Sequence, residues 1–196
     1  LTLSYLRCWR KQIAMTEYFN SKKNLRSRFI SIKYEDLVKN PKIVTKRLCK
    51  FLSIKYSDKM INSNNFMGLG LNKKWVPNSN YNTNQKGIYK TSLNKWKKFL
   101  KPDVRNFIEV IVGIELKYLG YIRKLNKIEK SKILKFHIKD FKNSKGWRTS
   151  GTSPKKDINL EISRYDYLKL NKISVEDTKK NFLFQEALLA FQSKLI

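Results

Sequence analysis

Apolar residues recur at helical spacing near the start of the chain, which predicts a helix from about residue 3 to residue 19. Its apolar positions are Leu3, Leu6, Trp9, Ile13 and Phe19, with Trp9 on the packed face. After a polar connection, the run 28–34 is short and rich in β-branched and aromatic residues, which predicts a buried strand. The chain therefore begins with a helix followed by a strand.

Proline residues mark the starts of two further helices. At Asn40-Pro41 the Asn side chain can cap free amide groups, and Pro at the first helical position lacks only a hydrogen that has no partner there. The Asn-rich residues 57–85 have no sustained period and predict a long loop. A helical region then opens at Ser92, and a longer helix begins at Pro102 and stops at Gly120.

The hydrophobic pattern weakens after Tyr121. Residues 142–157 predict a loop, and a final helix follows Ser174, which forms a weak capping box with Asp177. The only histidine, His137, has no Ser or Cys constellation around it in the sequence. A surface or packing role is therefore favoured for His137 over catalysis.

Length and composition indicate one folded core. The chain has 196 residues, of which 41% are hydrophobic and 13% aromatic, unlike a disordered chain. It starts with Leu1 rather than Met, so we expect further residues upstream. Cys8 and Cys49 form no CxxC pair, and neither a disulfide framework nor a metal site is predicted. No run approaches the roughly 20 apolar residues that span a bilayer, so we expect a soluble portion, with the cytoplasm favoured as its compartment.

The charge balance is strongly positive. Lys and Arg number 43 against 15 Asp and Glu, a formal net charge of +28. Such a chain attracts polyanions, so nucleic acid is a candidate partner. The charge is mostly Lys and is spread along the whole chain, which fits an anionic cofactor, an anionic glycan acceptor or a solvated surface equally well. Nucleic-acid binding is therefore an alternative and not the favoured reading.

The predicted strand and the residues that follow it resemble part of a known enzyme family. The run 28–41, with Tyr34-Glu35-Asp36-Leu37 followed by Asn40-Pro41, resembles the strand, Tyr-Glu-Asp-Leu motif and helix start of sulfotransferases that use 3′-phosphoadenosine-5′-phosphosulfate (PAPS). The helix continues to Phe51-Leu52, as in that family.

Three later segments carry the same resemblance in the same order. They are Trp75 with residues 77–81, the run Lys86 to Leu100 that contains Gly87 and Trp96-Lys97, and the helix end Leu119-Gly120-Tyr121. The resemblance covers about Trp9 to Tyr121. Gln85 stands where an Arg is usual, and the spacing from Gly87 to Trp96 is longer than in the cytosolic members, so transfer of that phosphate contact is in question.

The resemblance implies an α/β fold, with a P-loop nucleotide-binding-like parallel sheet flanked by helices. Residues 1–121 would form the C-terminal part of a sulfotransferase domain, and residues 122–196 a basic, mostly helical extension of unknown role. The family's phosphosulfate loop, catalytic Lys and catalytic base should precede Trp9. We therefore expect no catalytic residue in this chain and no activity from this portion alone.

The resemblance also implies which residues contact the nucleotide. Tyr34 would lie beside the adenine, with a core tyrosine as the alternative. Lys86 and Gly87 would close over the 3′-phosphate, because Gly lets the backbone approach and Lys supplies a compact charge. Trp96 and Lys97 would add a packing wall and charge, with a core role as the alternative for Trp96.

Two further motifs could carry chemistry, the paired carboxylates Glu35 and Asp36 and the run 148–153. Glu35 and Asp36 are paired carboxylates, but in the family they look structural rather than catalytic. The run 148–153 resembles the 5′-phosphosulfate loop. Such a loop needs a preceding strand and a following apolar helix, and Pro154-Lys155-Lys156-Asp157 follows instead, so we interpret the match as a coincidence.

The function that the resemblance implies is transfer of a sulfuryl group from PAPS to an acceptor hydroxyl or amine, leaving 3′,5′-ADP, with no metal required. The acceptor stays open among glycan, small molecule and peptide, and so does the oligomeric state. The alternatives are a basic nucleic-acid-binding protein and a degenerate relative that keeps the scaffold as an interaction module.

Overall fold

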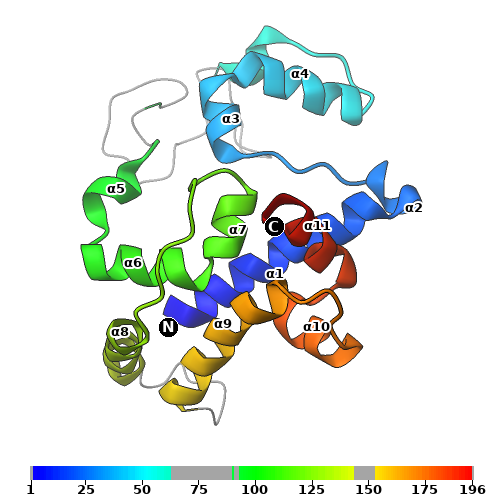
Figure 1. Ribbon diagram of the computed structural model, residues 1–196. Helices are drawn as coiled ribbons and strands as arrows, with labels where there is room; N and C mark the ends of the chain where they lie inside the picture. Colours follow the sequence, from blue (N-terminus) through cyan, green and yellow to red (C-terminus); the bar gives the residue numbers. More distant parts are fainter. Residues whose placement is uncertain (1, 63–89, 91–92, 144–152, 196) are drawn as a thin grey trace. The chain divides into compact units, whose positions relative to one another are not determined.

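The computed structural model describes residues 2–62, 90, 93–143 and 153–195, and the regular elements within those ranges are helices (Figure 1). In chain order they are α1 (Thr2–Ser21), α2 (Lys23–Arg26), α3 (Tyr34–Lys39), α4 (Pro41–Phe51), the short 3-10 helix η1 (Asp58–Ile61), α5 (Lys95–Phe99), α6 (Pro102–Ile111), α7 (Gly113–Tyr118), α8 (Lys130–Asn143), α9 (Pro154–Leu168), α10 (Val175–Phe182) and α11 (Gln185–Leu195).

The predicted α/β fold with a P-loop-like parallel sheet is wrong, because no strand is found in the described ranges. Residues 29–33 of the predicted strand run without regular structure, and Tyr34 opens helix α3 instead of ending a strand. A strand is held by hydrogen bonds to a neighbouring strand, and the described residues supply no such neighbour. The β-branched composition of the run was therefore not sufficient to make it a strand.

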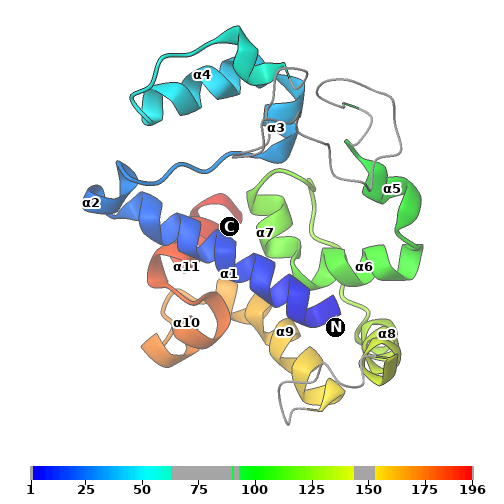
Figure 2. The ribbon, with the colours of Figure 1, turned by 180° about the vertical axis from the view of Figure 1, so that it is seen from behind.

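The chain divides into two compact units, one made of residues Leu1–Phe29 and Leu100–Ile196 and the other of Ile30–Phe99. The first, called here the two-ended unit, joins both ends of the chain. Its predicted N-terminal helix is confirmed as α1, which lies beside α9 and α11 in both ribbon views (Figures 1 and 2). The predicted boundary between residues 121 and 122 stays a prediction about how the sulfotransferase domain and its extension divide.

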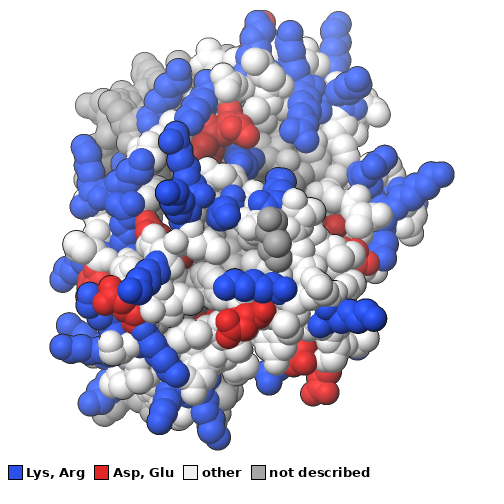
Figure 3. Space-filling view, in the orientation of Figure 1, with Lys and Arg blue, Asp and Glu red and all other residues white. Residues whose placement is uncertain are grey.

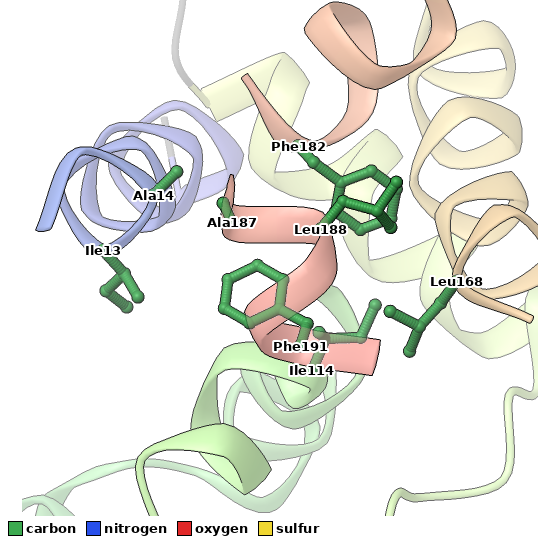
Figure 4. Packing of buried hydrophobic residues seen from close by; sticks show 8 residues of the cluster. All are labelled: Ile13, Ala14, Ile114, Leu168, Phe182, Ala187, Leu188 and Phe191. Carbon is green, nitrogen blue, oxygen red and sulfur yellow. The ribbon is translucent and has the colours of Figure 1, made fainter. Parts of the chain in front are cut away.

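The core of the two-ended unit contains two apolar clusters. Figure 4 shows the first, where Ala14 of α1 and Ala187 of α11 lie between their helices, and these small side chains let the two backbones approach closely. Around them pack Phe182, Leu188 and Phe191. The second cluster joins α1 to α6, α8 and α9, and its buried members are Leu3, Phe107, Val110, Ile111, Val112, Ile133 and Ile158.

The helix predicted from Pro102 to Gly120 is two helices, α6 and α7. Val112 leaves the helical region at φ −116° and ψ 22°. A Cβ on Gly113 would lie 2.8 Å from the hydroxyl oxygen of Tyr165, so glycine lets α9 approach this junction. The predicted stop is confirmed: Gly120 has φ +78°, and Tyr121 N–H donates to the Leu116 carbonyl at 2.8 Å, which closes the helix end as in a Schellman motif.

The C-terminal part is more helical than its sequence pattern predicted. Helix α8 extends to Asn143 and α9 begins at Pro154, so the predicted loop over 142–157 is partly helical. The cap at Ser174 is confirmed, since its hydroxyl accepts from the Asp177 N–H at 3.0 Å. The single predicted final helix is two helices, separated where Leu183 adopts φ 70°.

The second unit, called here the middle unit, contains α3, α4, η1 and α5 in its described part. Pro41 starts α4 as predicted, although the Asn40 side chain forms no cap hydrogen bond. Among the hydrophobic residues described in this unit, the buried ones are Val38, Val44 and Cys49. The predicted loop over 57–85 lies largely outside the described residues, and its first part forms η1.

Candidate functional site

Tyr34, the residue predicted to lie beside adenine, is the first residue of α3. Lys33 before it is extended, so the chain turns into the helix at this point. The Tyr34 side chain is 54% exposed, which leaves its ring accessible to a ligand and does not fit the alternative of a core tyrosine. Glu35 and Asp36 occupy the first turn of α3, where negative charge stabilises a helix N-terminus, as their predicted structural role requires.

Trp96 and Lys97 lie in α5, a helix of five residues, and both are exposed. The Lys97 ammonium lies 5.6 Å from the centroid of the Trp96 ring, within reach of a cation–π contact. Trp96 is 40% exposed, so the core alternative does not apply to its whole ring. Lys86 and Gly87 lie outside the described residues. The structure thus brings Trp96 and Lys97 together, and it places Tyr34 in the same middle unit.

The two-ended unit contains a group of buried charges that no sequence motif indicated, called here the ion cluster (Arg7, Arg10, Asp157 and Glu161). Arg7 on α1 donates to Glu161 at 2.7 Å and to Asp157 at 3.1 Å, both on α9. Arg10, one turn further along α1, donates to the other oxygen of Glu161. The two acidic side chains are almost fully buried, so α1 and α9 are joined by ion pairs where an apolar contact is usual.

Burial alone opposes ionisation of Glu161, but the nearby Arg10 and Arg7 outweigh it and hold the pKa of the Glu161 carboxyl below its ordinary value. At Arg10, in contrast, the effect of burial prevails: burial, together with repulsion from Arg164, lowers the pKa of its guanidinium although Glu161 lies beside it. Arginine nevertheless stays charged in proteins. Glu161 is therefore a fixed carboxylate whose lone pairs are occupied, which suits a structural role and not a general base.

Beside the ion cluster lies a second ion pair, called here the inner pair (Glu115 of α7 and Arg164 of α9). The two groups meet at 2.7 Å, with side-chain exposures of 0% and 2%. Arg164 also donates to the Asn181 carbonyl at 2.6 Å, and its guanidinium lies 5.0 Å from the Phe182 ring centroid. An adjoining cavity of about 40 Å³ has room for a few water molecules. The inner pair therefore ties α7, α9 and α10 together.

His137 is buried, which confirms the packing alternative for this residue and not the surface one. Its Nε2 lies 3.5 Å from Asp157, and its ring packs against Phe107 and Phe141. Burial, partly offset by the Asp157 carboxylate, lowers the pKa of the His137 imidazole. A neutral, enclosed imidazole of this kind cannot reach a substrate.

Metal and membrane features are the remaining candidates. Within the described ranges no three His, Cys, Asp or Glu side chains gather as metal ligands do. Cys8 and Cys49 are free thiols. Of the helices that the structure describes, none combines the length and the apolar character needed to cross a membrane.

Comparison of the sequence with models of protein families identifies the family of this chain. A family model described as the sulfotransferase domain matches residues 7–139, from α1 into α8. No match was found among the curated proteins or the solved structures. The matched residues include Tyr34, Lys86, Gly87, Trp96 and Lys97, and they continue past Tyr121, where the motif resemblance ended.

Proposed function

Because this chain belongs to the sulfotransferase domain family, as its motifs predicted, we propose that the protein transfers a sulfuryl group from PAPS to an acceptor hydroxyl or amine. The observation that carries the proposal is the family match over residues 7–139. The acceptor oxygen or nitrogen attacks sulfur in line, the bond from sulfur to the bridging phosphate oxygen breaks, and 3′,5′-ADP leaves. A base takes the acceptor proton, and positive groups stabilise the charge on the leaving oxygen.

In this proposal the chain contributes nucleotide binding rather than the chemical step. Tyr34 and Trp96 supply aromatic surface, and Lys97, Lys86 and Gly87 supply charge and close backbone approach at the 3′-phosphate. The exposure of Tyr34 and Trp96 supports these roles, because a ring must be accessible to stack on a base. In this proposal the described residues supply neither the base nor the catalytic lysine, so we infer that nucleotide binding, and not the chemical step, is the part of the reaction assigned to them.

The ion cluster and the inner pair have no catalytic role in this proposal. Their carboxylates are buried and already engaged by arginine. They hold the helices of the two-ended unit together.

Calorimetric titration of the full-length protein with 3′,5′-ADP tests the proposal. Loss of a base-stacking ring costs about 1–3 kcal/mol, so we expect Tyr34→Ala to bind about 5- to 150-fold more weakly. Tyr5→Ala is the matched control, since Tyr5 is an exposed tyrosine of α1. Equal binding of 3′,5′-ADP and 5′-ADP would contradict the proposal. Salt-sensitive binding of arbitrary DNA with no response to 3′,5′-ADP would favour the nucleic-acid alternative instead.

A further inference from the structure

A groove of about 330 Å³ lies between α6 and α8, inside the two-ended unit, and none of its lining residues is among those proposed to bind nucleotide. Cavities that hold small ligands start at roughly this size. The groove has an apolar floor, a wall of lysines on α8 and a polar wall on α6. None of these residues takes part in the ion cluster or the inner pair.

The floor is formed by Phe107, Ile133 and Phe136. Phe107 and Ile133 are each 1% exposed, so they are part of the packed core. Phe136 is half-buried and packs against Phe107 with 4.6 Å between ring centroids. The accessible part of the floor is therefore a small apolar surface that suits one apolar side chain.

The α8 wall consists of Lys132, Lys135 and Lys139, which follow one another at spacings of three and four and so share one face of the helix. Lys132 pairs with Glu129 at 2.7 Å. Lys135 and Lys139 form no ion pair with any other residue that the structure describes. Helix α8 carries five lysines and one aspartate, and Figure 3 shows Lys and Arg gathered at the lower left, where α8 lies in Figure 1.

The opposite wall consists of Asp103 and Asn106 from α6. One oxygen of Asp103 accepts from the Val104 N–H at 2.9 Å, and its other oxygen has capacity to accept from a ligand. The Asn106 amide can both donate and accept. This wall matches the N–H and C=O groups of a peptide backbone, whereas the Asp103 carboxylate repels anionic groups and so leaves them to the lysine wall on α8.

We propose that the groove binds an acidic peptide segment of a partner protein, with one apolar side chain on Phe136 and flanking carboxylates on Lys135 and Lys139. The α6 wall then pairs with the peptide backbone. A single-stranded nucleic acid fits less well, because its backbone carries a phosphate at every nucleotide and would meet the Asp103 carboxylate, whereas a peptide can place its neutral backbone on that wall. The proposal does not depend on sulfuryl transfer, since it uses none of the nucleotide-binding residues.

Fluorescence anisotropy with a labelled synthetic peptide, one phenylalanine flanked by glutamates on both sides, tests this site on the whole protein. We expect the double variant Lys135→Gln and Lys139→Gln to bind about five- to tenfold more weakly, the sum of two exposed ion pairs. The matched control is Lys169→Gln with Lys172→Gln, which removes the same charge from two exposed lysines of the same unit. The control should keep the affinity of the unaltered protein.

The same assay contains the outcomes that overturn the proposal. A peptide with serine in place of phenylalanine should bind clearly more weakly than the phenylalanine peptide. If the two peptides bind equally, charge alone attracts the peptide and the apolar floor plays no part. Equal weakening by the control double variant shows that the attraction is spread over the surface. If oligothymidylate binds more tightly than the peptide and loses affinity in the Lys135 and Lys139 variant, the groove is a nucleic-acid site.

Discussion

Among the residues that the structure describes, the two compact units differ in how much apolar surface they bury. The two-ended unit holds two core clusters, and Ile114 at its centre is 0% exposed. In the described part of the middle unit, Ile43 on α4 is 70% exposed, and Leu52 and Ile54 are also exposed. Regions with few buried apolar contacts open at low free energy. We therefore expect the two-ended unit to set the global stability and the middle unit to open locally.

This difference agrees with the proposed division of work. The residues proposed to hold the nucleotide all belong to the middle unit, and ligand-binding segments are generally drawn from the less stable parts of a protein. The buried ion pairs that fix the scaffold all belong to the two-ended unit. Four changes test the comparison, in decreasing order of expected effect.

The largest effect is expected from breaking the inner pair. Arg164→Met leaves the Glu115 carboxylate buried without its partner and should lower the free energy of unfolding by about 3–5 kcal/mol in urea titration. The double variant Arg164→Met with Glu115→Leu should recover most of this loss, because no lone charge remains. Lys42→Met breaks the exposed Lys42–Asp58 pair of the middle unit and should have no measurable effect on global stability. A double variant no more stable than Arg164→Met would show that the charges are not what matters.

A smaller loss is expected at the junction of α6 and α7. Gly113→Ala places a Cβ 2.8 Å from the Tyr165 hydroxyl oxygen, and Tyr165 donates to the Val110 carbonyl. Relief of this overlap should cost about 1–3 kcal/mol by urea titration. Gly120→Ala is the control, since nothing lies within 4 Å of its Cβ position and only its φ of +78° opposes the change. A smaller loss at Gly113 than at Gly120 would mean that α9 can move away freely.

The same substitution in each unit gives the most direct comparison. Ile114→Val removes a buried methyl group and should cost about 1 kcal/mol, whereas Ile43→Val should change the free energy of unfolding by less than about 0.5 kcal/mol. Amide hydrogen exchange measures the effect helix by helix. Ile114→Val should raise the exchange rates throughout α7 and α11 and leave those of α3 and α4 unchanged. Equal losses in the free energy of unfolding from the two substitutions would show that the two units do not differ in this way.

The smallest effect is expected from mild acid. The pKa of His137 is lowered in the folded state, chiefly by burial, so the unfolded chain binds a proton more readily as the pH falls through its ordinary value of 6.5. Stability should therefore be complete above that pH and decline below it. His137 is the only histidine, so His137→Phe should remove the slope between about pH 7 and 5.5 in urea midpoints. A slope that persists in this variant would assign the effect to other groups.

Features that depend on local chemistry could be predicted from the sequence. The proline starts at Pro41 and Pro102, the glycine stop at Gly120 and the cap at Ser174 all lie where the residue types indicated. The strand at 28–34 failed because a strand also needs a partner, which a local pattern cannot supply.

Helix α9 could not be predicted from apolar periodicity, because much of its buried face is charged. Asp157, Glu161 and Arg164 recur at helical spacing, and the first two are satisfied by Arg7 and Arg10, about 150 residues away in the chain. The signal that could have found them is this pair of matched charge patterns, arginines three apart on one helix and acids four apart on another. Without their partners such residues are indistinguishable from a solvated surface.

The contact between α1 and α11 imposes an order of events during synthesis. Ile13 and Ala14 of α1 leave the ribosome well before Ala187 and Phe191 of α11, which belong to the same apolar cluster, have been made. At a translation rate of about 5–20 residues per second, these side chains remain without their contact to α11 for roughly ten to thirty seconds. We therefore expect molecular chaperones that capture nascent chains to bind within Thr2–Ser21.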